Sequence, residues 1–291
     1  KVFMFYASLA DLLSTGQQAF LKGPVAMIFV EDLIEVESTI RHHQNIGFFS
    51  VIVFAPDELV LPTELEESVH RVRYNIHTKD ALQKAVDAVI AAAPNIWMYY
   101  CFNAEYLFYP FAETRNIAEL LAFHTEERRS AMLTYVIDLY AGDLNENNDA
   151  VSLKDVYLDR SGYYALGRFR GRENEAMERQ LDFFGGLRWR FEEHVPYERR
   201  RIDRIALFKS APGLTLRDDH TFSEEEYNTY ACPWHHNLTA AVCSFRTAKA
   251  LRKNPGSRYE IHNFRWRNSV PFEWRSQQLM DFGLMEPGQW F

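Results

Sequence analysis

The sequence predicts an α/β fold in which helices cover both faces of a mostly parallel sheet. Between residues 24 and 140, short apolar runs alternate with segments that have the spacing of amphipathic helices, and this alternation is typical of such a sheet. The length of 291 residues suits one large α/β domain or two small ones. Beyond residue 145 the alternation is lost, so we expect an irregular helical and aromatic region toward the C-terminal end.

The expected strands are continuous apolar runs, as in strands buried on both faces. They cover residues 25–30, 48–55, 69–76, 96–102 and 131–140. The expected helices lie between them: one over 31–45 that ends at Gly47, one with Thr78 as N-cap that ends before Pro94, and one opened by the capping pair Asn116 and Glu119.

Charge is distributed unevenly along the chain. Residues 1–150 hold 10 Lys and Arg against 21 Asp and Glu, a balance of −11, whereas residues 151–291 hold 22 against 19, a balance of +3; the sum is the net charge of −8. With a pI of about 5.7, the chain does not fit a nucleic-acid-binding protein. The three cysteines predict a reducing compartment, and we expect a cytoplasmic location. No apolar run is long enough for a transmembrane segment.

In parallel sheets, ligands bind beyond the carboxyl ends of the strands. The informative residues are therefore those that follow Val30, Ala55, Phe102 and Tyr140.

Four stretches, in order along residues 24–240, resemble the core of family-two-like bacterial glycosyltransferases. The longest is WMYYCFNAEYLFYPFAETRNIAELLAFHTEERRSAMLTYVIDLY (97–140), which is similar to a strand, a D-x-D-E-F-L loop, a helix and a strand ending in an m-l-D-m-Y motif. The others are VEDLIEVESTIRHHQNIGF (30–48), FGGLRWRF (184–191), similar to a GG-x-R-x-R element, and ALFKSAPGL followed by DDH (206–220).

The resemblance implies a GT-A fold, which is Rossmann-like, over residues 1–240, with 241–291 as an extension that packs on or near this domain. It also implies transfer of a sugar from a nucleotide-sugar donor to a saccharide or lipid-linked acceptor, in bacterial surface-polysaccharide assembly. A divalent ion, Mn²⁺ or Mg²⁺, would neutralise the donor's diphosphate, and a second carboxylate would serve as general base. A lipid-linked acceptor allows a peripheral association with a membrane.

The resemblance assigns roles to particular residues of this chain. The carboxylates that would do chemistry are Glu105 and Asp138. The donor-binding residues would be Glu31, Asp57, Asn103, Arg188, Arg190, Lys209 and His220. The metal-binding candidates are Glu105, His235 and His236. From the residues alone, Glu105 is equally a loop acid that binds backbone, and a carboxylate such as Asp138 between apolar neighbours either meets a partner or lines a cleft.

The sequence departs from the family at the metal site. Phe102 and Ala104 stand where the two D-x-D aspartates are expected, and Phe54 stands where an aspartate would follow the second strand. Phenylalanine cannot ligate a metal, so enzymatic activity stays open. The alternative function is a non-catalytic protein on the same fold that binds carbohydrate or a partner glycosyltransferase.

Two further readings concern the C-terminal part. The spacing of Cys232, His235, His236 and Cys243 offers soft ligands for zinc, although structural roles are the better explanation because the usual finger spacings are absent. The Arg- and Trp-rich segment 264–275 can stack on sugars or can pack against the domain.

Overall fold

The computed structural model describes residues 4–171, 174–230 and 237–290. The chain is an α/β protein with a large mixed, mostly parallel central sheet flanked by helices, as the sequence predicts, and this is compatible with a Rossmann-like arrangement. It divides into two compact units, each built from separate stretches of sequence. Unit 1 contains residues 1–104, 114–132 and 205–228, and unit 2 contains residues 105–113, 133–204 and 229–291.

Unit 1 contains a six-stranded part of the sheet in the order β1-β4-β3-β2-β5-β11. All neighbours pair in parallel except β11, which is antiparallel to β5. The strands are β1 (Phe5–Tyr6), β2 (Val25–Phe29), β3 (Ser50–Ala55), β4 (His70–Arg73), β5 (Trp97–Phe102) and β11 (Asp203–Lys209), of which the first two residues belong to unit 2.

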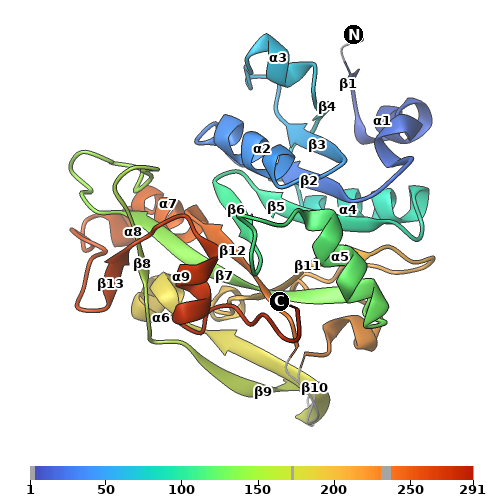
Figure 1. Ribbon diagram of the computed structural model, residues 1–291. Coiled ribbons are helices and arrows are strands. Elements are labelled where there is room, and N and C mark those ends of the chain that lie inside the picture. The colour runs from blue at the N-terminus through green and yellow to red at the C-terminus, as the bar shows by residue number, and fades with distance from the viewer. Residues whose placement is uncertain (1–3, 172–173, 231–236, 291) are drawn as a thin grey trace. The chain divides into compact units, whose positions relative to one another are not determined.

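The helices of unit 1 are α1 (Leu9–Thr15), α2 (Val36–Asn45), α3 (Thr63–Glu66), α4 (Ala81–Ala92) and α5 (Ile117–Glu126). The connection through α2 advances the sheet from β2 to β3, and the connection through α4 returns from β4 to β5. Right-handed crossovers in opposite directions place these two helices on opposite faces (Figure 1). β2 and β3 are buried along their whole length.

Two helix starts differ from the sequence prediction, and one agrees. α2 begins at Val36 and not directly after the strand, because Glu35 has a left-handed φ of 54° that interrupts helical geometry. Thr78 is not the N-cap of α4: Asp80 occupies that position, and the Thr78 hydroxyl donates to the carbonyl of Asn75. The capping box of Asn116 and Glu119 at the start of α5 is confirmed.

Unit 2 places β12 (Ala240–Ser244) between β7 (Ala131–Ala141), to which it is parallel, and β6 (Glu105–Phe108), to which it is antiparallel. β12 is thus a central strand of unit 2, although residue 240 is where the sequence predicts the end of a domain. Two antiparallel pairs complete the unit: β8 (Val156–Asp159) with β13 (Ser269–Pro271), and β9 (Tyr164–Arg170) with β10 (Glu175–Phe184). Its helices are α6 (Gly186–Arg190), α7 (Arg246–Lys253), α8 (Pro255–Arg258) and α9 (Ser276–Asp281).

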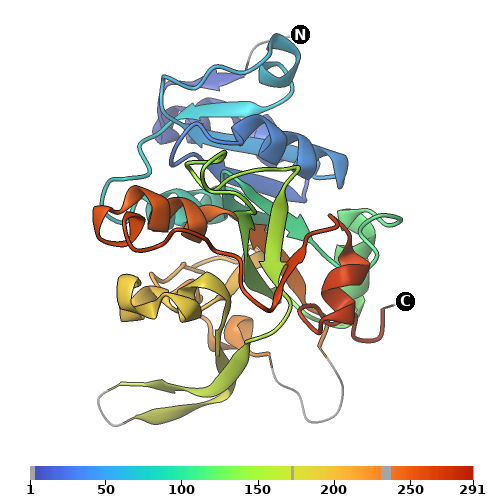
Figure 2. The same cartoon turned by 90° about the vertical axis from the view of Figure 1, so that its left-hand side faces the viewer.

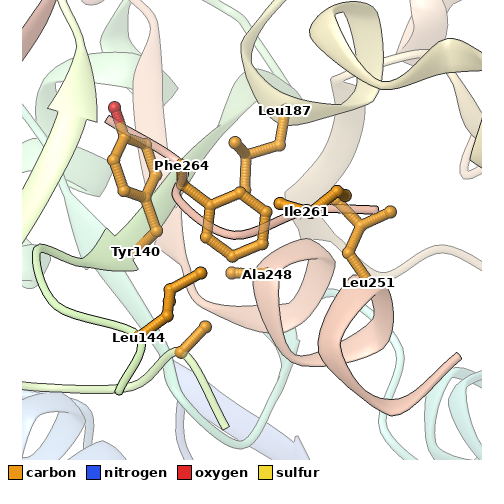
Figure 3. Close-up of a cluster of buried hydrophobic side chains, with 8 residues drawn as sticks. Tyr140, Leu144, Leu187, Ala248, Leu251, Ile261 and Phe264 are labelled. Carbon is orange, nitrogen blue, oxygen red and sulfur yellow. The ribbon is translucent and has the colours of Figure 1, made fainter. Parts of the chain in front are cut away.

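A compact apolar cluster joins β7, α6 and α7 within unit 2. Figure 3 shows Phe264 surrounded by side chains from these elements, and the members are Tyr140, Leu144, Ala150, Leu187, Ala248, Leu251, Ile261 and Phe264, all buried. Burial of each large side chain contributes about 1.5–3 kcal/mol. The segment that carries Ile261 and Phe264 is therefore part of the core of unit 2.

Candidate functional site

The carboxyl ends of four parallel strands meet at one edge of unit 1. β2, β3, β4 and β5 end at Phe29, Ala55, Arg73 and Phe102, and their registers align these ends. The segments that follow contain Glu31, Asp32, Asp57, His77 and Asn103. We call this set the carboxyl-edge cluster, because it lies where open α/β sheets bind ligands.

Asn103 organises the carboxyl-edge cluster. Its side-chain Oδ1 accepts a hydrogen bond from the backbone N–H of Glu31 (2.8 Å), and its Nδ2 donates to the Asp32 carboxylate (2.8 Å) and to the carbonyl of Ile34 (2.8 Å). The side chain is fully buried, and these bonds use its acceptor and both its donor hydrogens. Asn103 therefore fixes the segment that presents Glu31 and Asp32.

His77 approaches the same segment from the loop after β4. Its Nε2 lies 3.0 Å from the carbonyl oxygen of Glu31, and a carbonyl can only accept, so Nε2 carries the hydrogen. Neither His77 nor Asp32 is among the site residues predicted from the sequence. Asp32 lies two residues beyond Val30, and His77 directly follows the predicted strand 69–76, so the rule that ligands bind beyond the carboxyl ends of strands could have selected both.

Asp57 forms an ion pair on the surface of unit 1. Its carboxylate accepts a hydrogen bond from Nε of Arg73 at 2.6 Å, and both side chains are more than half exposed. Exposed pairs of this kind contribute little to stability, so Asp57 can exchange Arg73 for another partner at small cost.

Aromatic side chains occupy the positions at which the resemblance predicts aspartates. Phe54 and Phe102 are buried and flank Phe29 on the neighbouring strands, with ring centroids 4.7 and 6.3 Å from its own. Ala104 is also buried and has a φ of 60°. These positions belong to the core of unit 1 and carry no group that binds a metal.

Glu105 is fully buried in unit 2, at the start of β6. It forms a bidentate ion pair with Arg204, in which Nη1 lies 2.7 Å from Oε2 and Nη2 lies 3.1 Å from Oε1. It also accepts a hydrogen bond from the Ser244 hydroxyl at 2.9 Å. Both of its carboxylate oxygens are thus occupied by protein groups.

Asp138 lies in the same row of residues across the sheet of unit 2. The register pairs Ser244 of β12 with Glu105 on one side and Asp138 on the other. The Oδ2 atom of Asp138 accepts hydrogen bonds from the backbone N–H groups of Leu187 (2.9 Å) and Arg188 (3.4 Å). Burial raises the pKa of Asp138 above its ordinary value, although Arg188 and Thr247 favour the carboxylate.

Gly186, the residue before Leu187, allows the backbone at the start of α6 to lie this close to the Asp138 carboxylate. Gly186 has a φ of 64°, and a Cβ atom there would lie 2.8 Å from Oδ2 of Asp138. A side chain at position 186 would therefore displace the carboxylate. The GG-x-R-x-R element brings the start of α6 against β7.

The two arginines of that element bind protein groups of unit 2. Arg188 donates from Nε to Thr247 (3.1 Å) and from Nη1 to the carbonyl of Arg201 (2.6 Å). Arg190 pairs with Asp159 at 2.8 Å, and its guanidinium lies 4.9 Å from the centroid of the Trp266 ring. Asp159 also accepts from Trp266 and Tyr140, so Arg190 is part of the interior of unit 2.

Lys209 and His220 belong to unit 1. His220 has a φ of 63°, its ring stacks on that of Tyr100, and its Nδ1 lies 3.0 Å from the Tyr100 hydroxyl. Lys209, at the end of β11, is partly exposed, and its carbonyl accepts a hydrogen bond from Tyr227.

The D-x-D positions do not fit a divalent ion. In the described ranges, no group of three or more His, Cys, Asp or Glu side chains could hold a metal ion. The D-x-D positions are apolar and Glu105 is held by Arg204, so the usual metal-diphosphate arrangement has no ligands there. Three of the zinc candidates, Cys232, His235 and His236, lie outside the described residues.

No protein-family profile matches the sequence, and no curated protein matches it significantly. In the part of the chain that the structure describes, no helix combines the length and apolar character needed to cross a bilayer.

Proposed function

We propose that this chain is a glycosyltransferase-like protein of GT-A type that binds a nucleotide-sugar at the carboxyl-edge cluster of unit 1. The observation that carries the proposal is the arrangement around Asn103, which fixes a segment bearing Glu31 and Asp32 beyond β2 and brings the loop of His77 to it. The resemblance of four sequence stretches to family-two-like enzymes supports it independently.

The chemistry of the cluster suits hydroxyl and amide groups. Carboxylates accept hydrogen bonds from the hydroxyls of ribose and hexose and from base N–H groups. Three acidic side chains at one edge would repel a diphosphate that lacks its own counter-charge. We therefore assign Glu31, Asp32 and Asp57 to the nucleoside or sugar part of the donor.

Titration calorimetry with a panel of uridine, guanosine and thymidine diphosphate sugars, with and without Mn²⁺, tests this assignment. We expect saturable binding that weakens about tenfold or more in Glu31→Gln and Asp32→Asn, since each loses a charged hydrogen-bond acceptor. Asparagine at 32 can still accept from Asn103, so the segment stays in place. If the protein binds none of these nucleotide-sugars, the proposal is wrong.

Glu126→Gln is a matched control. Glu126 is exposed near the end of α5, where the adjacent Thr125 accepts a hydrogen bond from Trp97 at the beginning of β5. It therefore lies at the amino edge of the strands, opposite the carboxyl-edge cluster. Its removal should leave nucleotide-sugar binding unchanged.

The second candidate function is a non-catalytic protein on the same fold, and the packing of Phe54 and Phe102 around Phe29 favours it. This apolar core replaces the acidic motif on which transfer depends in the family. Release of nucleoside diphosphate in the presence of a saccharide acceptor distinguishes the two functions. Binding without release supports the second, and release above the rate of spontaneous hydrolysis supports the first.

A further inference from the structure

The hairpin of β9 and β10 in unit 2 carries an apolar face. Its directly opposed pairs on that face are Ala165 with Phe183, Gly167 with Leu181, and Phe169 with Ala176. Ala165, Gly167 and Ala176 are exposed, and Phe169 is 59% exposed. Figures 1 and 2 show β9 and β10 as an extended two-stranded arm of unit 2.

The two edges of this arm differ. The edge of β10 is partly covered, because the N–H of Ile202 donates to the carbonyl of Phe183 and the N–H of Tyr230 donates to that of Arg179. β10 also has an irregularity between Ala176 and Leu181 that interrupts regular pairing. Among the described residues, none of the backbone hydrogen bonds of residues 164–169 leaves the hairpin.

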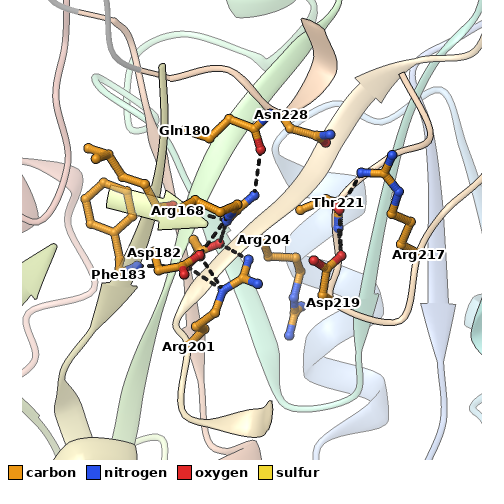
Figure 4. A network of polar contacts seen from close by, with 12 residues as sticks. Arg168, Gln180, Asp182, Phe183, Arg201, Arg204, Arg217, Asp219, Thr221 and Asn228 are labelled. Carbon is orange, nitrogen blue, oxygen red and sulfur yellow. Dashed lines mark hydrogen bonds and ion pairs between the residues drawn. The ribbon is translucent and has the colours of Figure 1, made fainter. Parts of the chain in front are cut away.

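β9 also has little of the usual protection of an edge strand, because Arg170 is its one charged side chain besides Arg168. Natural edges carry Lys, Pro or bulges that prevent pairing with another chain. The sequence YALGRFR has no Lys or Pro, and the irregularity lies in β10. The charge of Arg168 is neutralised inside the unit by Asp182 (2.7 Å) and Asp203 (2.6 Å). Figure 4 shows Arg168 beside Asp182 and Arg201, so this arginine is held within the unit.

We infer that β9 is a self-association edge, at which two copies of this chain pair their β9 strands antiparallel about a two-fold axis. Such a contact is self-complementary, because each copy presents the same strand. A pairing centred on Gly167 puts Phe169 of one copy opposite Ala165 of the other. Large side chains thus face small ones, and the apolar ladder continues across four strands.

The charge of the arm favours a second copy of this chain as the partner of β9. Residues 164–184 contain four Arg and four acidic residues, so the arm has no net attraction to an anionic membrane. In a pairing centred on Gly167, Tyr164 of each copy faces Arg170 of the other, which suits a cation–π contact. The inference does not depend on the proposed function.

Sedimentation velocity of the full chain from about 1 to about 100 µM tests the inference. We expect a concentration-dependent dimer that is at least about tenfold weaker in Phe169→Glu and in Ala165→Glu. Both positions are exposed, so both variants should fold. Val60→Glu is the control, because Val60 is an 87% exposed apolar residue of unit 1. It should dimerise as the unaltered chain does.

Hydrogen exchange gives a second readout. Backbone amides of β9 should exchange more slowly at the concentration where the dimer dominates, and those of β13 should not. A chain that stays monomeric throughout overturns the inference, as does a dimer that survives both charged substitutions or one that Val60→Glu dissociates. Binding of the monomeric chain to phosphatidylglycerol vesicles through Phe169 would assign the arm to a membrane and would equally overturn it.

Discussion

Glu105 and Arg204 bring opposite charges into a part of unit 2 from which water is excluded. Their side chains are 0% and 2% exposed, and Ser244 supplies one more hydrogen bond. Desolvation of two ions opposes folding, so the pair is tolerated because each ion satisfies the other. The arrangement gives Glu105 a structural task within unit 2, whatever its part in chemistry.

Replacement of one partner should therefore be costly. We expect Glu105→Ala to lower the free energy of unfolding by about 3–5 kcal/mol, because Arg204 would remain as an uncompensated buried charge. Urea unfolding followed by fluorescence measures this loss. The double variant Glu105→Leu with Arg204→Met should recover most of it. A loss below about 1 kcal/mol in the single variant would show that solvent reaches the pair.

The buried Asp138 makes a prediction about pH. Its pKa is raised in the folded protein, so between the ordinary aspartate pKa and the raised value the folded state holds more protons than the unfolded state. The stability that comes from protonation of Asp138 is present below the ordinary pKa and is lost as pH rises through the raised one.

In Asp138→Asn this dependence should disappear. Urea unfolding of both proteins at several pH values from 4 upward should give a difference in free energy of unfolding that changes steadily in favour of the variant as pH rises. A difference that stays constant with pH would show that Asp138 titrates in the folded protein as it does in the unfolded chain.

At the scale of elements, α4 and α5 begin in different ways. The Asn116 side chain caps α5 through the N–H of Glu119 at 3.0 Å, and Glu119 returns a bond at 2.8 Å. α4 begins at Ala81, after the N-cap residue Asp80, which has a φ of 57° and makes no side-chain cap. Local sequence suggests a cap for both helices, but only one forms it.

Asn116→Ala should lower the free energy of unfolding by about 1 kcal/mol, because it leaves the N–H of Glu119 in the first turn without its acceptor. Thr78→Ala serves as the comparison, since the exposed Thr78 caps no helix, and its effect should stay within about 0.5 kcal/mol. Thermal or urea unfolding of the two variants measures both changes in the free energy of unfolding. Equal losses would contradict the assignment of the caps.

The sequence could predict most elements of residues 24–141, because each is a local pattern of apolar spacing and turn residues. It could not predict β6, which follows β5 after only two residues and depends on the left-handed φ of Ala104. The pairing of β11 with β5 joins residues about a hundred positions apart, and no local pattern specifies it.

Local sequence patterns also predict only part of the candidate site. The strand-end rule brings Glu31 and Asn103 together, and the structure joins them. Glu105 is only two residues beyond Asn103, yet it pairs with Arg204 in unit 2. Its burial follows from a partner 99 positions later in the chain, which spacing alone cannot reveal.

At the scale of the whole molecule, the buried histidines of unit 1 and the buried Asp138 of unit 2 should respond oppositely to acid. Unit 1 contains His70 and His124, whose pKa values are lowered by burial, that of His124 to about 4. Unfolding releases these rings to bind protons, so their contribution to stability is lost as pH falls from about 6.5 toward 4. Unit 2 contains Asp138, whose raised pKa acts in the other direction.

Hydrogen exchange at pH 7 and pH 4.5, corrected for intrinsic rates, can detect this contrast. We expect protection of β2, β3 and β5 to fall more at the lower pH than protection of β7 and β12. Substitution of His124 by Gln should reduce the fall in unit 1, because glutamine can still donate to the carbonyl of Ala131 and does not titrate. An equal fall in both units would contradict the prediction.

The interleaving of the two units also affects how the chain is made. Unit 1 needs residues 205–228, and β12 of unit 2 must insert between two strands that leave the ribosome more than a hundred residues earlier. During synthesis, the edges of β6 and β7 that pair with β12 therefore stay unpaired until residue 244 has left the ribosome. A nascent chain released early would expose these edges, and we expect chaperones to bind it in preference to the finished protein.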